Sequence, residues 1–199
     1  MRIGKLIPAA ALSVMAATAP ALAHTGVGAA HDLAHGVLHP LTGVDHILAM
    51  VAVGLFAAHL GGRALWLVPA TFVAIMAVGG AIGMSGLPIP FVETGIALSV
   101  VALGLVLMTR IAPPVGVAMA LVGLFAIFHG HAHGAETPAD VGALNYALGF
   151  LAATVLLHAC GVGLGVSIGR AGKSVSTYAA RVGGGAMALA GVGLLAGWI

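Results

Sequence analysis

Residues 39–60 read HPLTGVDHILAMVAVGLFAAHL, and this stretch decides the fold because polar groups lead directly into a long apolar run. A helix that crosses a bilayer needs about 20 mostly apolar residues, which residues 41–60 provide. Similar runs recur along the chain between short breaks that contain Pro or Gly. The sequence therefore predicts an all-α integral membrane protein, a bundle of six transmembrane helices at 41–60, 64–84, 92–109, 112–133, 142–168 and 177–198.

The composition excludes most soluble classes of protein. Of the 199 residues, 61% are hydrophobic and 6% are charged, whereas a soluble domain carries about 25% charged residues. The few Lys and Arg residues are scattered singly, so nothing resembles the basic stripe that follows nucleic-acid phosphates. The single cysteine, Cys160, excludes an intrachain disulfide. Because the breaks between the spans leave no room for a soluble domain, any function has to reside within the bundle.

The N-terminus has the pattern of a secretory signal peptide. Arg2 and Lys5 precede a short apolar stretch, and residues 21–23 read ALA, as is typical of a cleavage site. Two prolines interrupt the stretch, which argues against a permanent span. We therefore expect residues 1–23 to be removed and residues 24–199 to form the six-helix transmembrane domain, with its new N-terminus outside the cytoplasmic membrane.

The charges give an independent test of this orientation. If the mature N-terminus lies outside and the chain crosses six times, every mature cation falls on the inner side, as the positive-inside rule requires: Arg63, Arg110, Arg170, Lys173 and Arg181. The acids, which were not used for the assignment, all fall on the outer side: Asp32, Asp45, Glu93, Glu136 and Asp140. We expect a multi-pass protein of the bacterial cytoplasmic (inner) membrane with both mature termini on the periplasmic side.

Imidazoles and carboxylates gather at the outer ends of the first and fourth spans. A helix rises 1.5 Å per residue, so His129 and His133 lie about 6 Å apart on one helix face. Ionisable groups within a membrane are costly, and a divalent transition metal such as Ni, Cu, Zn or Co gives nitrogen and oxygen donors a shared partner. The sequence therefore predicts a metal site made of His39, Asp45, His46, His129, His133 and Glu136.

Five other histidines are weaker candidates for metal binding: His24, His31, His35, His131 and His158. The first three precede the first span, where they either collect metal at the mouth of the bundle or belong to a solvated leader. His158 lies deep in the fifth span and is either a second station on a metal pathway or a hydrogen-bonded packing residue. His59, beside a pair of glycines at the inner end of its span, is expected to have a structural role.

Two motifs resemble the signatures of a known family. HPLTGVDH (39–46) and FHGHAHGAE (128–136) are similar to the HPxxGxDH and FHGxxHGxE motifs of the HupE/UreJ nickel permeases, which also have a signal peptide, six spans and short loops. The resemblance implies a transporter, not an enzyme, that supplies Ni²⁺, with Co²⁺ as second candidate, to hydrogenase or urease. It implies that the six residues of the predicted site are the functional ones, and that the metal is a transported substrate with no resident cofactor.

Two other functions are also compatible with the residues alone. Residues 83–86 read GMSG and match the GxSG pattern of rhomboid-like intramembrane proteases, for which Ser85 would be the nucleophile and His158 the base. A nucleophile and its base must lie within hydrogen-bond reach, and nothing in the sequence brings these two together. A metal sensor or storage protein is the third reading, against which the lack of a soluble output domain argues. The sequence ranks neither nickel against cobalt and zinc nor one oligomeric state against another.

Overall fold

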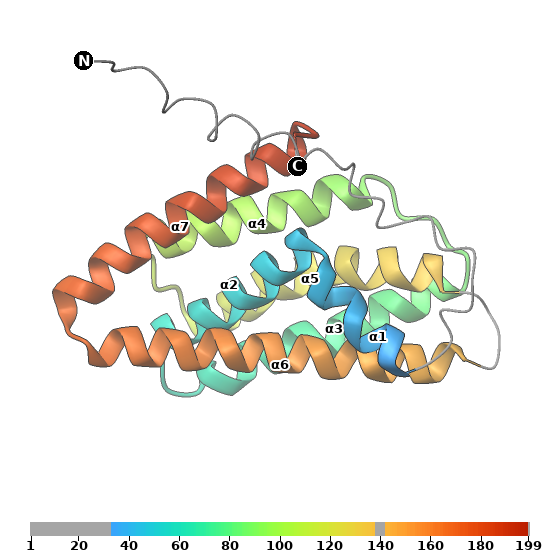
Figure 1. The fold of residues 1–199 in the computed structure, drawn as a ribbon, viewed down its shortest axis with the longest axis horizontal. Coiled ribbons are helices and arrows are strands. Elements are labelled where there is room, and N and C mark those ends of the chain that lie inside the picture. The colour runs from blue at the N-terminus through green and yellow to red at the C-terminus, as the bar shows by residue number, and fades with distance from the viewer. Residues whose placement is uncertain (1–32, 138–141, 199) are drawn as a thin grey trace, which may run out of the picture.

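The computed structural model describes residues 33–137 and 142–198, and these residues form a bundle of seven α-helices (Figure 1). In chain order the helices are α1 (Leu33–Thr42), α2 (Val44–Leu60), α3 (Ala64–Met84), α4 (Val92–Thr109), α5 (Val115–Glu136), α6 (Ala143–Arg170) and α7 (Lys173–Leu195). The all-helical expectation is confirmed for this part of the chain. The predicted signal peptide and the candidates His24 and His31 lie outside the described residues.

The first predicted span is not a single straight helix. Its first residues, 41 and 42, belong to α1, and the axis bends by 84° between α1 and α2. Gly43, at the bend, has extended backbone angles (φ −81°, ψ 118°) and so interrupts the helical hydrogen bonding. Pro40, inside α1, has no N–H to give to the carbonyl of residue 36, and this weakens the last turns of α1 just before the break. Five described helices, α3 to α7, are each long and apolar enough to cross a membrane, and the bent α1–α2 pair makes a sixth span if it counts as one.

Two predicted helix boundaries differ from the observed ones for local reasons. The fourth predicted span, 112–133, corresponds to α5, which begins only after Pro113 and Pro114 and then continues to Glu136. The acid therefore stands in the last turn of the helix and not in the following loop. The sixth, 177–198, corresponds to α7, which begins directly after Gly172, a residue with a φ of +110° that turns the chain away from α6.

Among helices α2 to α7, small residues let the backbones of three pairs approach closely. A Cβ on Gly130 of α5 would overlap the carbonyl of Met76 on α3, and one on Gly134 would overlap the carbonyl of Gly80. The backbones of α4 and α7 approach through Gly104 in the same way, and Figure 1 shows these two helices running together along one side of the bundle. The remaining pair, α2 and α6, meets at Gly54 and Gly161.

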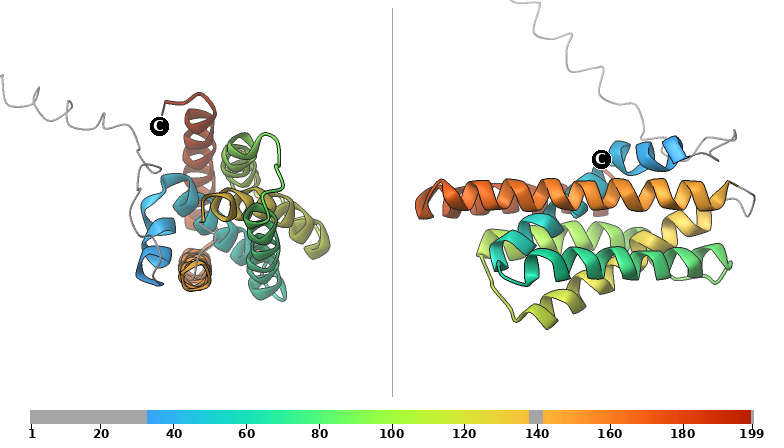
Figure 2. Two further views of the ribbon diagram at one scale, coloured as in Figure 1. Left: turned by 90° about the vertical axis from the view of Figure 1, so that its right-hand side faces the viewer. Right: turned by 90° about the horizontal axis from the view of Figure 1, so that it is seen from below.

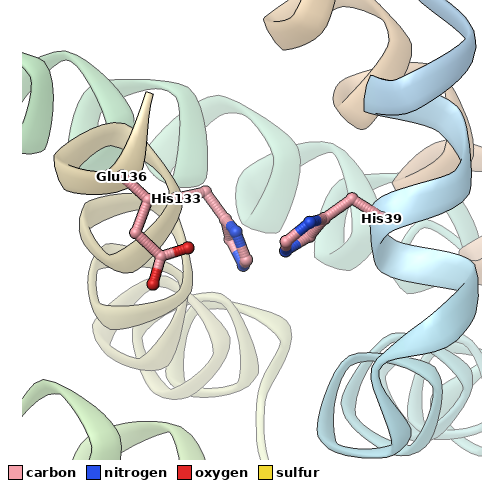
Figure 3. A group of neighbouring side chains, drawn as sticks. All are labelled: His39, His133 and Glu136. Atoms are coloured by element: carbon pink, nitrogen blue, oxygen red, sulfur yellow. The ribbon is translucent and has the colours of Figure 1, made fainter. Parts of the chain in front are cut away.

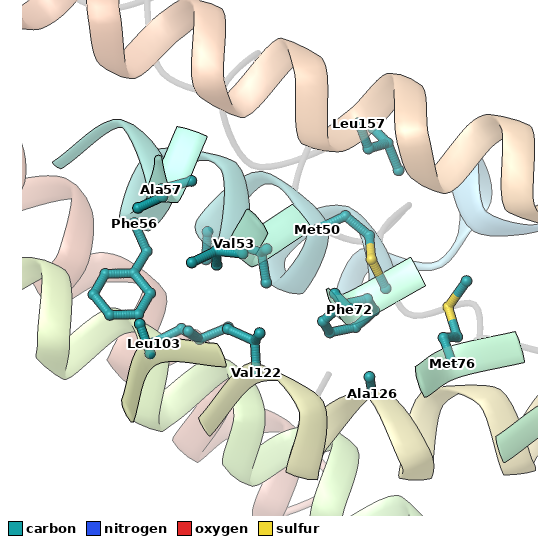
Figure 4. Packing of buried hydrophobic residues seen from close by; sticks show 14 of the residues in the cluster. Met50, Val53, Phe56, Ala57, Phe72, Met76, Leu103, Val122, Ala126 and Leu157 are labelled. Carbon is teal, nitrogen blue, oxygen red and sulfur yellow. The ribbon is translucent and has the colours of Figure 1, made fainter. Parts of the chain in front are cut away.

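The apolar core lies around α2 (Figure 4). Met50, Val53 and Phe56 of α2 are fully buried, as is Phe72 of α3. Large apolar side chains also cover the outside of the bundle, for example Leu189, which is 74% exposed. Helices that are apolar on every side suit burial in a bilayer. This arrangement agrees with the membrane class that the composition predicts.

The short helix α1 packs along the beginning of α6 (Figure 2). A Cβ on Gly36 would overlap the backbone of Tyr146, and one on Gly149 would overlap the carbonyl of Leu33. The two glycines thus hold α1 against α6 by direct backbone contact. This placement brings His39, near the end of α1, toward the last turns of α5.

Candidate metal site

The break between α1 and α2 creates the first part of the site. Asp45 Oδ1 lies 3.1 Å from His46 Nδ1, in the first turn of α2. A Cβ at Gly43 would fall 2.8 Å from that carboxylate oxygen and 3.3 Å from that ring nitrogen, so a larger residue would disturb the pair. Because a carboxylate only accepts hydrogen bonds, His46 Nδ1 carries the proton. The Nε2 lone pair of His46 therefore points into the bundle.

A serine on α4 orients the second imidazole. Ser99 Oγ donates to the carbonyl of Ile96 at 2.6 Å, and it lies 3.0 Å from His129 Nε2. Since the only hydroxyl proton goes to Ile96, the ring nitrogen is the donor of the second bond. This leaves the lone pair of neutral His129 on Nδ1. That nitrogen faces His46 Nε2 at 3.4 Å.

His133 joins the two rings from the next turn of α5. Its Nε2 lies 2.6 Å from His46 Nε2, so this nitrogen also faces the space in front of His46. Ring nitrogens of His46, His129 and His133 thus converge from two helices. The exposed fractions of the three side chains are 4%, 0% and 6%, so the convergence lies in a buried environment.

A second group of donors extends the site toward the end of the bundle. One ligand atom from each of His39, His133 and Glu136 lies within 4.8 Å of the other two. Figure 3 shows the rings of His39 on α1 and His133 on α5 pointing toward one another, with the Glu136 carboxylate beside them. Glu136 is exposed, His39 half-buried and His133 buried. Because His133 belongs to both groups, the donors form one chain from the surface to His129.

Aromatic rings of α6 and α3 pack against the cluster of histidines. The Phe150 ring lies 4.4 Å from His133, 6.0 Å from His46 and 6.2 Å from His39, centroid to centroid. Phe72 contacts His129 from the other side, at 5.7 Å. A cavity of about 160 Å³ adjoins His133 between α3, α5 and α6, beside the glycines that bring α3 and α5 together. It provides room for water next to the imidazole.

Three residues at the site had no distinguishing signal in the sequence: Ser99, Phe72 and Phe150. A lone Ser in an apolar span ordinarily bonds a carbonyl of its own helix, and Ser99 does so as well. Its second contact, to His129, depends on how α4 and α5 pack, and no local pattern signals it. The two phenylalanines look like any other core residues in the sequence.

The remaining described histidines make other contacts and are not among the converging nitrogens. His131 Nε2 donates to the carbonyl of Leu87 at 2.8 Å, in the turn after α3. His59 donates to the carbonyl of Arg110 at 3.1 Å, which agrees with the structural role expected of it. His35 is exposed on α1. His158 is buried in the middle of α6, where its ring contacts Phe72.

The described contacts do not join Ser85 to a base. Its hydroxyl donates to the carbonyl of Ile82 at 2.7 Å in an exposed turn, whereas the contact of His158 is with Phe72 in the core. The serine is thus accounted for by ordinary turn chemistry. The geometry gives no support to an intramembrane protease.

The fold and the site together define a helical membrane protein with a histidine- and carboxylate-rich centre suited to a divalent transition metal. The chain belongs to the HupE/UreJ family: the model of the HupE / UreJ protein family matches residues 12–194. The Protein HupE of Rhizobium leguminosarum bv. viciae is 51% identical over 187 residues, which cover 94% of this chain and 95% of that protein. The family is associated with nickel and cobalt uptake for hydrogenase and urease. No solved structure matches the chain.

Proposed function

We propose that the chain carries Ni²⁺ inward across the bacterial cytoplasmic membrane, with Co²⁺ as a second substrate, and so supplies metal for hydrogenase or urease. Family membership supports the class of transporter. The observation that carries the proposal for this chain is the convergence of buried ring nitrogens from His46, His129 and His133. The proposed orientation has these residues on the periplasmic side and both mature termini outside.

A cation is the natural occupant of this convergence. With the protons placed as above, neither His46 Nε2 nor His129 Nδ1 carries a proton, so the approach of these two nitrogens to 3.4 Å is unfavourable unless a cation or a donated proton lies close to them. Two nitrogens that each lie about 2.1 Å from a tetrahedral Zn²⁺ ion are roughly 3.4 Å apart, so the 3.4 Å between these two nitrogens is compatible with a shared divalent ion. In the metal-free chain His133 Nε2–H donates to His46 Nε2, and a bound cation would replace that proton.

The donors suggest an order of events during entry. His39 and Glu136 lie nearer the surface than the buried pair, so they would meet a hydrated ion first. His133 would then pass the ion to His46 and His129, because it contributes to both groups. Spreading the donors over several positions makes each binding step weak enough for the ion to leave again. A closed cage would instead retain it.

The donor chemistry favours a borderline first-row metal. Imidazole nitrogen and carboxylate oxygen suit Ni²⁺ and Co²⁺, whereas thiolates favour softer ions. Cys160, the single cysteine of the chain, is exposed on the outside of α6 and contributes no sulfur to the site. Affinity alone would rank Cu²⁺ higher at such a site. The choice of nickel therefore rests on the family and not on the geometry.

Uptake of ⁶³Ni²⁺ by cells that lack other nickel transporters tests the proposal. We expect the native chain to accumulate many metal ions per protein molecule, which separates transport from storage at one site. The double variant His46→Ala, His129→Ala should fall to the background of cells without the protein, while His59→Ala should retain uptake. Transport by the double variant at the native rate would contradict the assigned site. Competition by Co²⁺, Zn²⁺ and Cu²⁺ in the same assay ranks the substrates.

A further inference from the structure

His158 is an anomaly among the described histidines. Its side chain is 2% exposed, and neither ring nitrogen has a hydrogen-bond partner among the residues that the structure describes. In contrast, His59 and His131 each bond a backbone carbonyl, and His129 bonds Ser99. Buried polar side chains are nearly always hydrogen-bonded, so an exception requires an explanation.

Packing alone does not explain an imidazole at this position. The ring contacts Phe72 edge-on, with centroids 5.1 Å apart, and an aromatic hydrocarbon ring would make the same contact without two unpaired nitrogens. The Thr154 hydroxyl is the nearest one along the helix, and it already donates its proton to the carbonyl of Phe150 at 2.9 Å. The earlier alternative of a hydrogen-bonded packing residue is therefore not supported, and the lone pair of His158 remains available.

The position of His158 relates it to the metal site. Tyr146, Phe150, Thr154 and His158 follow one another at four-residue spacing along α6, and all four are buried. The first two lie beside the donor cluster, where the Tyr146 ring is 6.0 Å from His39. The same face of α6 thus continues from the cluster to His158. At 1.5 Å per residue, His158 lies about 12 Å deeper along α6 than Phe150.

Phe72 connects His158 to the innermost donor of the cluster. Its ring contacts His129 at 5.7 Å and His158 at 5.1 Å, centroid to centroid, so the two imidazoles share one neighbouring side chain. Figure 4 shows Phe72 beside Met50, below Leu157, the residue that precedes His158. Rotation of this one phenylalanine ring would therefore change the surroundings of both histidines. Ionisable residues that face the interior of a helical bundle commonly mark ion pathways.

We propose that His158 is a second, inner metal-binding station that receives the divalent cation from His46 and His129. This inference rests on the proposed function, because it concerns the route of the same ion. The station offers one imidazole nitrogen where the outer cluster offers several donors. It therefore holds the ion more weakly and favours its onward release. Phe72 contacts an imidazole of each station.

The variant His158→Phe tests the proposal because it preserves an aromatic ring in the core and removes both nitrogens. Two quantities are measured: the Kd of the purified protein for Ni²⁺ by equilibrium dialysis in detergent, and ⁶³Ni²⁺ uptake by cells per folded protein. We expect a Kd within threefold of native and an uptake rate at least fivefold lower. His59→Phe is the matched control, because it also replaces an imidazole by a phenyl ring in the bundle, and it should keep both values near native.

Three results would overturn the proposal. An uptake rate of His158→Phe less than fivefold below native would make His158 a packing residue or one bridged by water. Loss of Ni²⁺ binding in this variant alone would make His158 part of the outer site and not a separate station. An equal loss of uptake in the His59→Phe control would make the effect one of bundle packing. If neither native protein nor variants bind Ni²⁺, the proposed function itself fails. Should His158→Phe not fold, His158→Gln replaces it under the same criteria.

Discussion

His46 Nε2 and His129 Nδ1 lie 3.4 Å apart, although the two residues are 83 positions apart in the sequence. Each ring is held from behind by a different polar group, His46 by Asp45 and His129 by Ser99. These supports fix which nitrogen of each ring carries the proton. The site thus depends on residues that need not touch the metal.

Asp45→Asn should reduce uptake without removing a direct ligand of the buried centre. The amide has the shape of the carboxylate but no charge, and its NH₂ group can face His46 Nδ1 and reverse the proton arrangement. Loss of such a supporting carboxylate typically costs 10–100-fold in metal affinity or activity. We expect a loss of roughly that size in ⁶³Ni²⁺ uptake and in Ni²⁺ affinity. Glu93→Gln makes the same chemical change at an exposed residue of α4 and should leave both values near native.

Ser99→Ala should weaken Ni²⁺ binding by about tenfold, at the lower end of the range for supporting residues. The change leaves His129 Nε2–H buried without its acceptor. The ring can then place its proton on Nδ1, which removes the lone pair that faces His46. Isothermal titration of the purified protein with Ni²⁺ measures the effect.

Ser85→Ala is the matched control for that experiment. Both hydroxyls donate to a carbonyl three residues earlier, but Ser85 lies in an exposed turn and contacts no imidazole. Its removal should leave Ni²⁺ affinity unchanged. Equal effects of the two substitutions would mean that Ser99 stabilises the helix only and does not orient His129.

The side chains that gather at the candidate site stood out in the sequence more than the residues that support them. His39, His133 and Glu136 could be grouped because ionisable residues are costly in an apolar setting, so each one stands out. Asp45 stood out in the same way. Ser99 and Phe150 did not, because a hydroxyl bonded within its own helix and an aromatic core residue are ordinary in a bundle. Their role arises only when α4 and α6 pack beside α5.

The fold was predicted to a similar extent. The length of the apolar runs identified the helices α3 to α7, since a run of about 20 mostly apolar residues can be recognised in the sequence alone. The length of a run could not reveal the 84° bend between α1 and α2 at Gly43, because it carries no information on the direction of the helix axis. Pro40 and Gly43 indicated a weak start to the first span, but not that residues 33–42 would form a helix against α6. That contact depends on Gly36 and Gly149, which meet only in three dimensions.

Gly130→Ala should destabilise the bundle by roughly 1–3 kcal/mol, the usual cost of overpacking a core. Gly130 belongs to the second sequence motif, and its added Cβ would overlap the carbonyl of Met76 on the facing helix α3. The two helices would have to separate, which would also displace His129 and His133 from His46. We therefore expect a lower thermal unfolding temperature in detergent together with weaker Ni²⁺ binding.

Gly163→Ala provides the control for this prediction, because an added Cβ at that position of α6 meets no neighbouring atom. Replacing an open helical Gly by Ala usually stabilises a helix by about 0.5–1 kcal/mol. The two substitutions should thus shift the unfolding temperature in opposite directions. If Gly130→Ala were as stable as Gly163→Ala, the close approach of α3 and α5 would be wrong. The glycines of the motif would then need a role other than letting the helices that carry the donors meet.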